Sequence, residues 1–258
     1  MKVSVITACY NRASTIEGAM RSVFAQDYGS IEYVIVDGAS TDGSVDVIES
    51  VIKDAPTNVE VKFISERDSG MYEAINKGIA MATGDAIALC HSDDTLFDSH
   101  VISDYVKRFE ETDADMIYAD GLFVDADNPS KVIRHWIGGN YTKWKVRHGW
   151  LPLHPTCYIK KDFMQKAGLY DTKYKIAADS ELLVRYLTMD SIKVSYMKRR
   201  NTVMMRMGGL STDSAKRKMM WDEDIDVYTR HGFKLPTIKK LEKMMWKVPQ
   251  FILGLINA

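Results

Sequence analysis

The sequence has few cysteines, no excess charge and no long apolar run, and each shortage excludes a class of protein. Its 258 residues include three cysteines, Cys9, Cys90 and Cys157, which are far apart in apolar surroundings. They lack the paired spacing of a zinc site, so we expect reduced thiols in the core. No stretch reaches the roughly 18 apolar residues of a membrane-spanning helix. The first residues lead directly into a predicted strand rather than a signal peptide, so we expect a cytoplasmic protein.

The charges of the chain nearly cancel. There are 34 basic and 35 acidic residues, which leaves no basic field for DNA or RNA, and we expect no nucleic-acid partner. The hydrophobic content of 46% is enough for the core of a globular protein.

Two nucleotide-binding motifs are also missing. A G-x-G-x-x-G pattern would follow the first strand of a dinucleotide-binding domain, but residues 7–12 read Thr-Ala-Cys-Tyr-Asn-Arg. No G-x-x-x-x-G-K-[ST] sequence occurs anywhere in the chain. The sequence therefore predicts neither an NAD-binding domain nor a P-loop.

Short β-branched runs alternate with segments of helical periodicity in the first half. Strands are predicted at 3–6, 31–36, 59–64 and 86–89. The clearest helix follows Gly70, where Met71, Ile75, Ile79 and Ala82 lie on one face. Because the strands are almost continuously apolar, they are typical of a parallel sheet covered on both faces. We expect a doubly wound α/β fold.

After Asp120 the pattern changes to shorter elements. Strands are expected at 121–124, 131–136, 156–159, 192–196 and 202–205, with helices near 161–167 and 180–189. This half is predicted to be mixed α+β. No linker or repeat separates the two halves, so we expect them to share one core.

Acidic residues follow three of the predicted strands. Asp37, Asp68 and the pair Asp93–Asp94 stand where ligands bind in an open parallel sheet, beyond the carboxyl ends of its strands. Several of these acids also have a simpler interpretation. Asp37 could be a turn residue, nearby Asp42 a helix N-cap, and Asp93–Asp94 a solvated acid pair.

The adjacent carboxylates of Asp93 and Asp94 repel each other at the end of a buried strand, and a divalent cation would offset this repulsion. Two carboxylates cannot supply the roughly six oxygens that Mg²⁺ or Mn²⁺ requires. The remaining ligands would be water and oxygens of a phosphorylated substrate. The pair therefore predicts a metal-bridged diphosphate.

These motifs together resemble family 2 glycosyltransferases of the GT-A fold, of the kind that build bacterial surface polysaccharides. The resemblance covers roughly residues 1–215. It rests on motifs that occur in the family's order, at 5–12, 36–44, 65–78, 91–94, 177–185 and 207–211. His91 and Ala178 stand where many members have acidic residues. The Q-x-x-R-W motif of polymerising members is absent, which favours transfer of a single sugar.

The resemblance implies inverting transfer from a nucleotide-diphosphate sugar, preferentially UDP-linked, to a saccharide or lipid-linked saccharide. It implies Mn²⁺ or Mg²⁺ at Asp94 and Asp93, with Asp94 the favoured ligand. Asp179 would be the general base, although it could equally cap a helix, and Glu181 is the second candidate. Asp37 would accept the imide N–H of uracil. His154 would face the phosphates or the acceptor, unless it is structural beside Pro155.

The donor-binding residues that this resemblance implies are Thr7, Tyr10, Asn11, Arg12, Asp37, Ser40, Asp42, Arg67, Asp68, Asn76, Asp93, His154, Gly209 and Ser211. We predict a catalytic domain over 1–233. Residues 1–120 would bind the nucleotide sugar, and 121–233 would bind the acceptor and supply the base.

Residues 234–258 are predicted to form a basic amphipathic tail. Ile238, Leu241, Met245 and Val248 share one helical face, and lysines occupy the other. This pattern is typical of a helix at a membrane interface, here the inner face of the plasma membrane. The alternatives are packing on the catalytic domain or contact within a homodimer.

Two rival functions stay open. His91 and Ala178 would suit a degenerate glycosyltransferase that binds nucleotide sugars as a scaffold. A sugar nucleotidyltransferase is less favoured, because its Gly-rich basic loop after the first strand is missing here.

Overall fold

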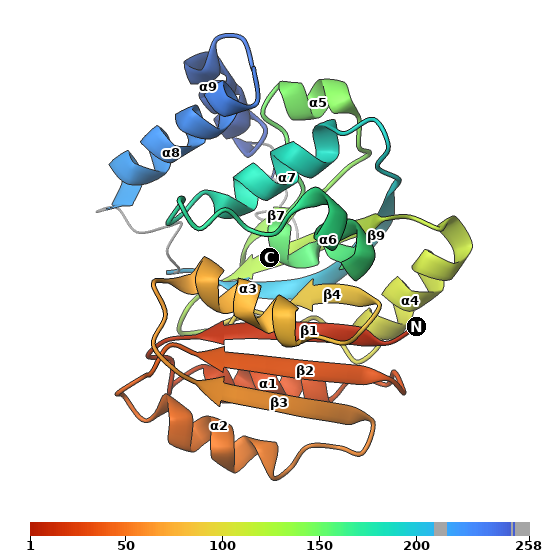
Figure 1. The fold of residues 1–258 in the computed structure, drawn as a ribbon, viewed down its shortest axis with the longest axis vertical. Helices are drawn as coiled ribbons and strands as arrows, with labels where there is room; N and C mark the ends of the chain where they lie inside the picture. The colour runs from red at the N-terminus through yellow and green to blue at the C-terminus, as the bar shows by residue number, and fades with distance from the viewer. Residues whose placement is uncertain (209–215, 249, 251–258) are drawn as a thin grey trace.

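The computed structural model describes residues 1–208, 216–248 and 250. Within these residues, a nine-stranded sheet is covered by helices on both faces (Figure 1). The strands are β1 (Val3–Cys9), β2 (Ile31–Asp37), β3 (Val59–Ser65), β4 (Ala86–Leu89), β5 (Thr95–Leu96), β6 (Met116–Val124), β7 (Val132–Trp136), β8 (Tyr158–Lys160) and β9 (Val194–Arg206). The helices are α1 (Ile16–Phe24), α2 (Ser44–Ile52), α3 (Met71–Met81), α4 (Val101–Thr112), α5 (Lys143–Arg147), α6 (Lys161–Ala167), α7 (Ala178–Thr188), α8 (Arg217–Arg230) and α9 (Pro236–Met245), with a 3₁₀ turn η1 (His154–Thr156).

The first four strands form the predicted parallel unit. β1 pairs in parallel with β2 on one side and β4 on the other, and β2 continues to β3. The chain order therefore reverses between β1 and β4, which is where open α/β sheets leave a crevice for ligands. One core cluster contains α3 and α7, and a second contains α1, α2 and α4. The three cysteines are free and buried, as predicted.

The second half is mixed, as expected, but two predicted strands are one. The strands predicted at 192–196 and 202–205 are parts of the single strand β9, which begins only at Val194 and pairs in parallel with β6. The register of this pairing shifts beside Asp120, and Arg199 has a φ of +60°. A local irregularity of this kind bends a strand without ending it, so the polar interruption resembled a loop in the sequence.

Two further details differ from the sequence interpretation. Residues 154–156 form a 3₁₀ turn, so that the strand predicted at 156–159 begins only at Tyr158. The predicted division after residue 120 falls inside β6, a strand that runs without a break from Met116 to Val124. The two halves share this strand, and the division after residue 120 stays a functional prediction.

The described part of the tail, residues 234–248 and 250, packs on the rest of the chain. α9 lies against α8, and a Cβ added to Gly149 would approach the backbone nitrogen of Lys243 to 2.6 Å. The indole N–H of Trp246 donates to the carbonyl of His148 at 2.8 Å. Among the described residues, no helix has the length and apolar character needed to cross a membrane.

Candidate active site

A cleft of about 380 Å³ opens at the crevice between β1 and β4 and extends to the tail. We call it the central cleft. Asp93 and Asp94 reach it from the loop after β4, and Asp179 reaches it from the first turn of α7. Arg12 and His154 also line it. The structure thus brings together the predicted metal ligands, the predicted base and two predicted donor contacts.

Asp94 is a buried carboxylate with an unused oxygen. Its side chain is 2% exposed, and Oδ1 accepts the backbone N–H of Arg206 at 3.2 Å. Its Oδ2 is buried and has no hydrogen-bond partner among the residues that the structure describes. Burial, and then the charge of Asp93, raise the pKa of Asp94 well above its ordinary value. A cation beside Oδ2 would satisfy this oxygen and favour the ionised form.

The residues at this position suit a divalent metal only in part. In the described ranges, no group of three or more His, Cys, Asp or Glu side chains could hold an ion by itself. Asp93 is adjacent and partly exposed, with Oδ2 3.8 Å from Nε of Arg12. Two acidic neighbours with one unsatisfied oxygen fit an ion that takes its other ligands from substrate phosphates and water.

The loops after β1 and β2 are connected by side-chain hydrogen bonds. Asn11, with a left-handed φ of 52°, accepts the N–H of Thr41 and donates its own N–H to Ser40. The N–H of Arg12 donates to Ser44 Oγ at 2.7 Å, and Asp42 accepts the N–H of Ala13 at 3.0 Å. These contacts hold Arg12 at the edge of the central cleft. The N-cap of α2 is Gly43 rather than Asp42.

Asp37 and Thr7 are structural parts of this region. Asp37 is fully buried, and its carboxylate accepts from the N–H and Oγ of Ser40 and from Ser65 Oγ. Thr7 is buried as well and donates to the carbonyl of Cys90. A direct contact between Asp37 and uracil needs an accessible oxygen, so this contact stays a prediction. In the structure, Asp37 holds the loop that contains Ser40.

An open surface lies beside this loop at Tyr10, Gly38 and Asp68. Tyr10 is 62% exposed, and a Cβ added to Gly38 would lie 2.7 Å from Oδ2 of Asp68 and 3.3 Å from the Tyr10 ring. Glycine is therefore needed for the three loops to meet. Asp68 Oδ1 accepts the N–H of Gly70, and Arg67 is exposed. Neither Asp68 nor Arg67 lines the central cleft.

Asn76 does not line the central cleft but hydrogen-bonds to the backbone of Tyr170. Its amide donates to the carbonyl of Tyr170 at 2.9 Å and accepts the N–H of the same residue at 3.1 Å. The Tyr170 hydroxyl lies 2.7 Å from Nε2 of His154, which lines the cleft. Burial lowers the pKa of His154 to about 4, so the imidazole is neutral at pH 7. A neutral His154 can hydrogen-bond to a ligand but provides no positive charge for phosphate.

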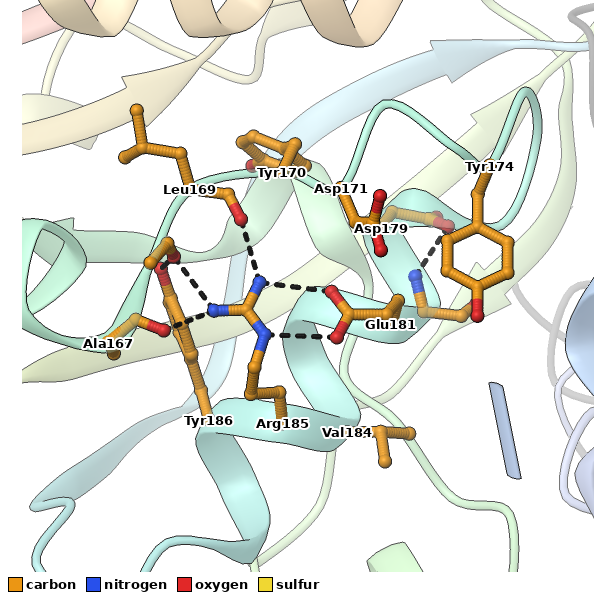
Figure 2. A network of polar contacts seen from close by, with 12 residues as sticks. Ala167, Leu169, Tyr170, Asp171, Tyr174, Asp179, Glu181, Val184, Arg185 and Tyr186 are labelled. Atoms are coloured by element: carbon orange, nitrogen blue, oxygen red, sulfur yellow. Dashed lines mark hydrogen bonds and ion pairs between the residues drawn. The ribbon is translucent and has the colours of Figure 1, made fainter. Parts of the chain in front are cut away.

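The two acids of the segment 177–185 point to different surroundings (Figure 2). Asp179 lines the central cleft, and its Oδ1 accepts the N–H of Ser180 at 2.6 Å. α7 begins at Ala178 with Ala177 as its N-cap, so Asp179 lies inside the first turn rather than at the cap. Its position leaves one side of the carboxylate for a ligand.

Glu181 instead belongs to a buried ion-pair network. Both of its oxygens accept from the guanidinium of Arg185 at 2.9 Å, and His231 Nε2 lies 3.1 Å from Oε1. Arg185 also donates to the carbonyls of Ala167, Gly168 and Leu169, and so it caps the end of α6 (Figure 2). Glu181 lines a separate pocket. The structure therefore does not bring the second candidate base to the central cleft.

Several cleft residues were not anticipated from the sequence. Arg206 lies beside Asp94, and the far wall contains Arg134, Trp136, Lys240, Lys243 and Lys247. Arg206 directly precedes the motif at 207–211, and this position could have identified it as a site residue. The lysines appeared only as the polar face of a tail helix. Gly209 and Ser211 lie outside the described residues.

Comparison with known proteins identifies the family of the chain. The model of the family "Glycosyl transferase family 2" matches residues 4–169. A PGL/p-HBAD biosynthesis glycosyltransferase of Mycobacterium bovis is 25% identical over 236 residues, which cover 90% of this chain and 87% of the relative. An uncharacterized glycosyltransferase of Nostoc sp. is 40% identical over 113 residues, or 44% of this chain, but this match covers only 34% of the relative.

Two solved structures share the fold. S. aureus TarS 1-349 in complex with UDP-GlcNAc superposes with a TM-score of 0.68 at 17% identity, covering 95% of this chain and 71% of that chain. A mannosyltransferase of Pyrobaculum calidifontis in complex with GDP-Man and Mn²⁺ has a TM-score of 0.69 at 18% identity, covering 100% of this chain and 74% of that chain. With the GT-A-like sheet, the acidic pair after β4 and the family match in agreement, the chain belongs to glycosyl transferase family 2.

Proposed function

We propose that the protein is an inverting glycosyltransferase that moves a single sugar from a nucleotide-diphosphate sugar to a saccharide or lipid-linked saccharide. The observation that carries this proposal is the shared position of Asp94 and Asp179. They are far apart in the sequence, yet both line the central cleft. One lacks a partner for a buried oxygen, and the other is accessible to a ligand.

In this mechanism, Asp179 accepts the proton of the acceptor hydroxyl as that oxygen attacks the anomeric carbon. Attack opposite the leaving diphosphate gives inversion. Glu181 is not assigned this role, because Arg185 and His231 occupy its oxygens. Neutral His154 contributes a hydrogen bond within the same cleft.

The departing diphosphate accumulates negative charge near Asp93 and Asp94. A Mn²⁺ or Mg²⁺ ion held by Asp94, with Asp93 beside it, would act there as a Lewis acid. Arg206 and Arg12 lie at the same end of the cleft and supply positive charge from the protein. The backbone of each arginine is held by a hydrogen bond: the N–H of Arg12 donates to Ser44, and the N–H of Arg206 donates to Asp94.

We assign the nucleotide base to the surface formed by Tyr10, Gly38 and Asp68. Tyr10 offers an exposed ring for stacking, and Asp68 offers a carboxylate oxygen for a base or ribose donor. The similar structures contain UDP-GlcNAc in one case and GDP-Man in the other. We favour UDP, because the resemblance implies a UDP-linked donor and the Asp68 carboxylate could accept the imide N–H of uracil.

The experiment is thermal unfolding with UDP, GDP, CDP and dTDP, each with and without Mn²⁺. A ligand at about one hundred times its dissociation constant adds about 2.7 kcal/mol, which raises the Tm by a few degrees. We expect UDP to stabilise the protein only with Mn²⁺, and Asp94→Asn to abolish the effect. Asp98→Asn is the matched control, since Asp98 pairs with Arg200 outside the cleft. No response to any nucleotide would contradict the transferase proposal.

The tail suggests a peripheral membrane contact. The outward face of α9 and the residues after it is apolar, with Leu241 48% and Met245 70% exposed, whereas Lys240 and Lys243 point to the domain. We therefore expect vesicle binding to depend on apolar side chains more than on anionic lipid. Leu241→Ser with Met245→Ser should weaken co-sedimentation with phosphatidylcholine vesicles and leave the Tm nearly unchanged. Vesicle binding equal to that of the unmodified protein would contradict this role.

A further inference from the structure

The tail places its lysines in the central cleft. Lys240, Lys243 and Lys247 all line it, although the sequence pattern had suggested that they face a membrane surface. One acid, Asp224 of α8, serves two of them: Lys240 and Lys243 both donate to its carboxylate. This part of the cleft therefore has an excess of positive charge.

Lys247 differs from Lys240 and Lys243 in its surroundings. In the part of the chain that the structure describes, no carboxylate lies within ion-pair distance of it, and its ammonium is 5.8 Å from the centre of the Trp136 ring. Burial, with repulsion from Lys243 and Arg134, lowers the pKa of Lys247 to about 7. An anion bound here would restore the charged form.

Trp136 supplies a second unused donor. Its indole Nε1–H is buried and has no hydrogen-bond partner among the described residues. Its ring lies 4.5 Å from the Arg134 guanidinium, and it packs with Phe123, Met205 and Met207 in one apolar cluster that borders the cleft. A cation, a free N–H and an apolar surface therefore adjoin one another.

This wall is directly connected to the proposed base. Lys243 Nζ donates at 2.8 Å to Oγ of Ser180, the residue next to Asp179. The far wall and Asp179 therefore belong to one continuous cleft. The donor loops lie at the opposite end, around Arg12 and Asp93.

We propose that Lys247, Trp136 and the adjoining apolar cluster form an acceptor subsite for a phosphate ester that carries an apolar chain. The phosphate oxygens would meet Lys247 and the indole N–H, and the chain would lie along Phe123, Met205 and Met207. This inference rests on the proposed function, since it names the class of acceptor for the same cleft.

The test uses octyl phosphate as the probe, in calorimetric titrations with UDP and Mn²⁺ present to occupy the donor side. Lys247→Met removes the cation, and we expect it to weaken octyl phosphate binding about tenfold. Trp136→Phe removes only the N–H donor, so we expect a loss of a few-fold. Lys234→Met is the matched control, because Lys234 is exposed and lies outside the cleft. It should bind like the unmodified protein.

Two companion ligands separate the parts of the subsite. Octyl β-glucoside has the chain without the charge, and inorganic phosphate has the charge without the chain. Both should bind more weakly than octyl phosphate. Equal binding of octyl β-glucoside would overturn the anionic part, and equal binding of inorganic phosphate would overturn the apolar part.

Separate titration of UDP with Mn²⁺ distinguishes failure of the acceptor subsite from failure of the proposed transferase function. Retained UDP binding by Lys247→Met shows that the variant is folded. Unchanged octyl phosphate affinity in that variant, or no octyl phosphate binding to the unmodified protein, overturns the acceptor assignment alone. Failure of UDP to bind the unmodified protein counts against the proposed function, whatever octyl phosphate does.

Discussion

The two ends of the central cleft are built in different ways. At the donor end, Arg12, Asp93 and Asp94 lie on short loops that directly follow parallel strands, and their neighbours in space are set by the order of strands. At the far end, Trp136, Asp224 and Lys247 come from β7, α8 and the tail. The donor end combines two acids with two arginines, and the far end is cationic and aromatic. A cleft can therefore have one end that is readable from the sequence and another that only packing creates.

The largest expected effect separates the proposed base from its neighbour Glu181. Asp179→Asn keeps the shape of the side chain but cannot accept a proton, so kcat for the donor that the protein turns over should fall about 1,000-fold. The affinity for UDP with Mn²⁺ should stay unchanged, because Asp179 is not assigned a donor contact. Steady-state kinetics beside UDP titration measure both. A variant with normal kcat would remove Asp179 from the mechanism.

The next effect tests the cationic end. Asp224 is buried, and although burial would raise its pKa, Lys243 and Lys240 lower it. Asp224→Asn leaves two buried lysines without a counter-charge, so the free energy of unfolding should fall by about 3 kcal/mol. Urea unfolding gives this value.

Asp222→Asn is the matched control on the same helix. Asp222 is exposed and pairs with exposed Lys218, so its removal should cost less than about 0.5 kcal/mol. Equal losses for the two variants would mean that the far wall is not held by Asp224.

The smallest expected effect concerns the network of Glu181 (Figure 2). Burial opposes ionisation of this carboxyl, but His231 and Arg185 lower its pKa from the ordinary 4.5 to about 2. Because the folded-state pKa is lowered, the ionised group stabilises the fold above pH 4.5, and this contribution is lost as the pH falls towards 2. Glu181→Gln should therefore lose about 2 kcal/mol at pH 7 and have a flatter stability curve between pH 5 and 2. If the stability of Glu181→Gln and of the unmodified protein fell equally between pH 5 and 2, the proposed ionisation of Glu181 would be wrong.

Much of the fold was predictable because it rests on local patterns. The four apolar runs of the first half became β1 to β4, and the 3.6-residue periodicity after Gly70 became α3. The acids after β4 were identifiable since a strand end and a like-charge pair coincide there. By contrast, β9 was predicted as two strands, because the polar residues around Arg199 interrupt its apolar pattern. In the structure, β9 continues through this irregularity because both of its parts pair with β6.

The site was predictable only for residues whose roles depend on nearby sequence. The resemblance implied Asp179 as the base and Glu181 as the second candidate, and their surroundings differ because Arg185 binds Glu181. Asn76 was predicted to contact the donor, whereas its amide is taken up by the backbone of Tyr170. Long-range partners of this kind have no signature in a single chain.

The sequence by itself determined the parallel half of the sheet, the acidic strand ends and the amphipathic character of the tail, since these follow from spacing and side-chain chemistry. The tertiary structure decided which way the tail faces. The same alternation suits a helix with lysines towards lipid headgroups or towards a buried acid. Packing of α9 on Gly149 and Asp224 selects the second arrangement and turns a surface pattern into a wall of the cleft.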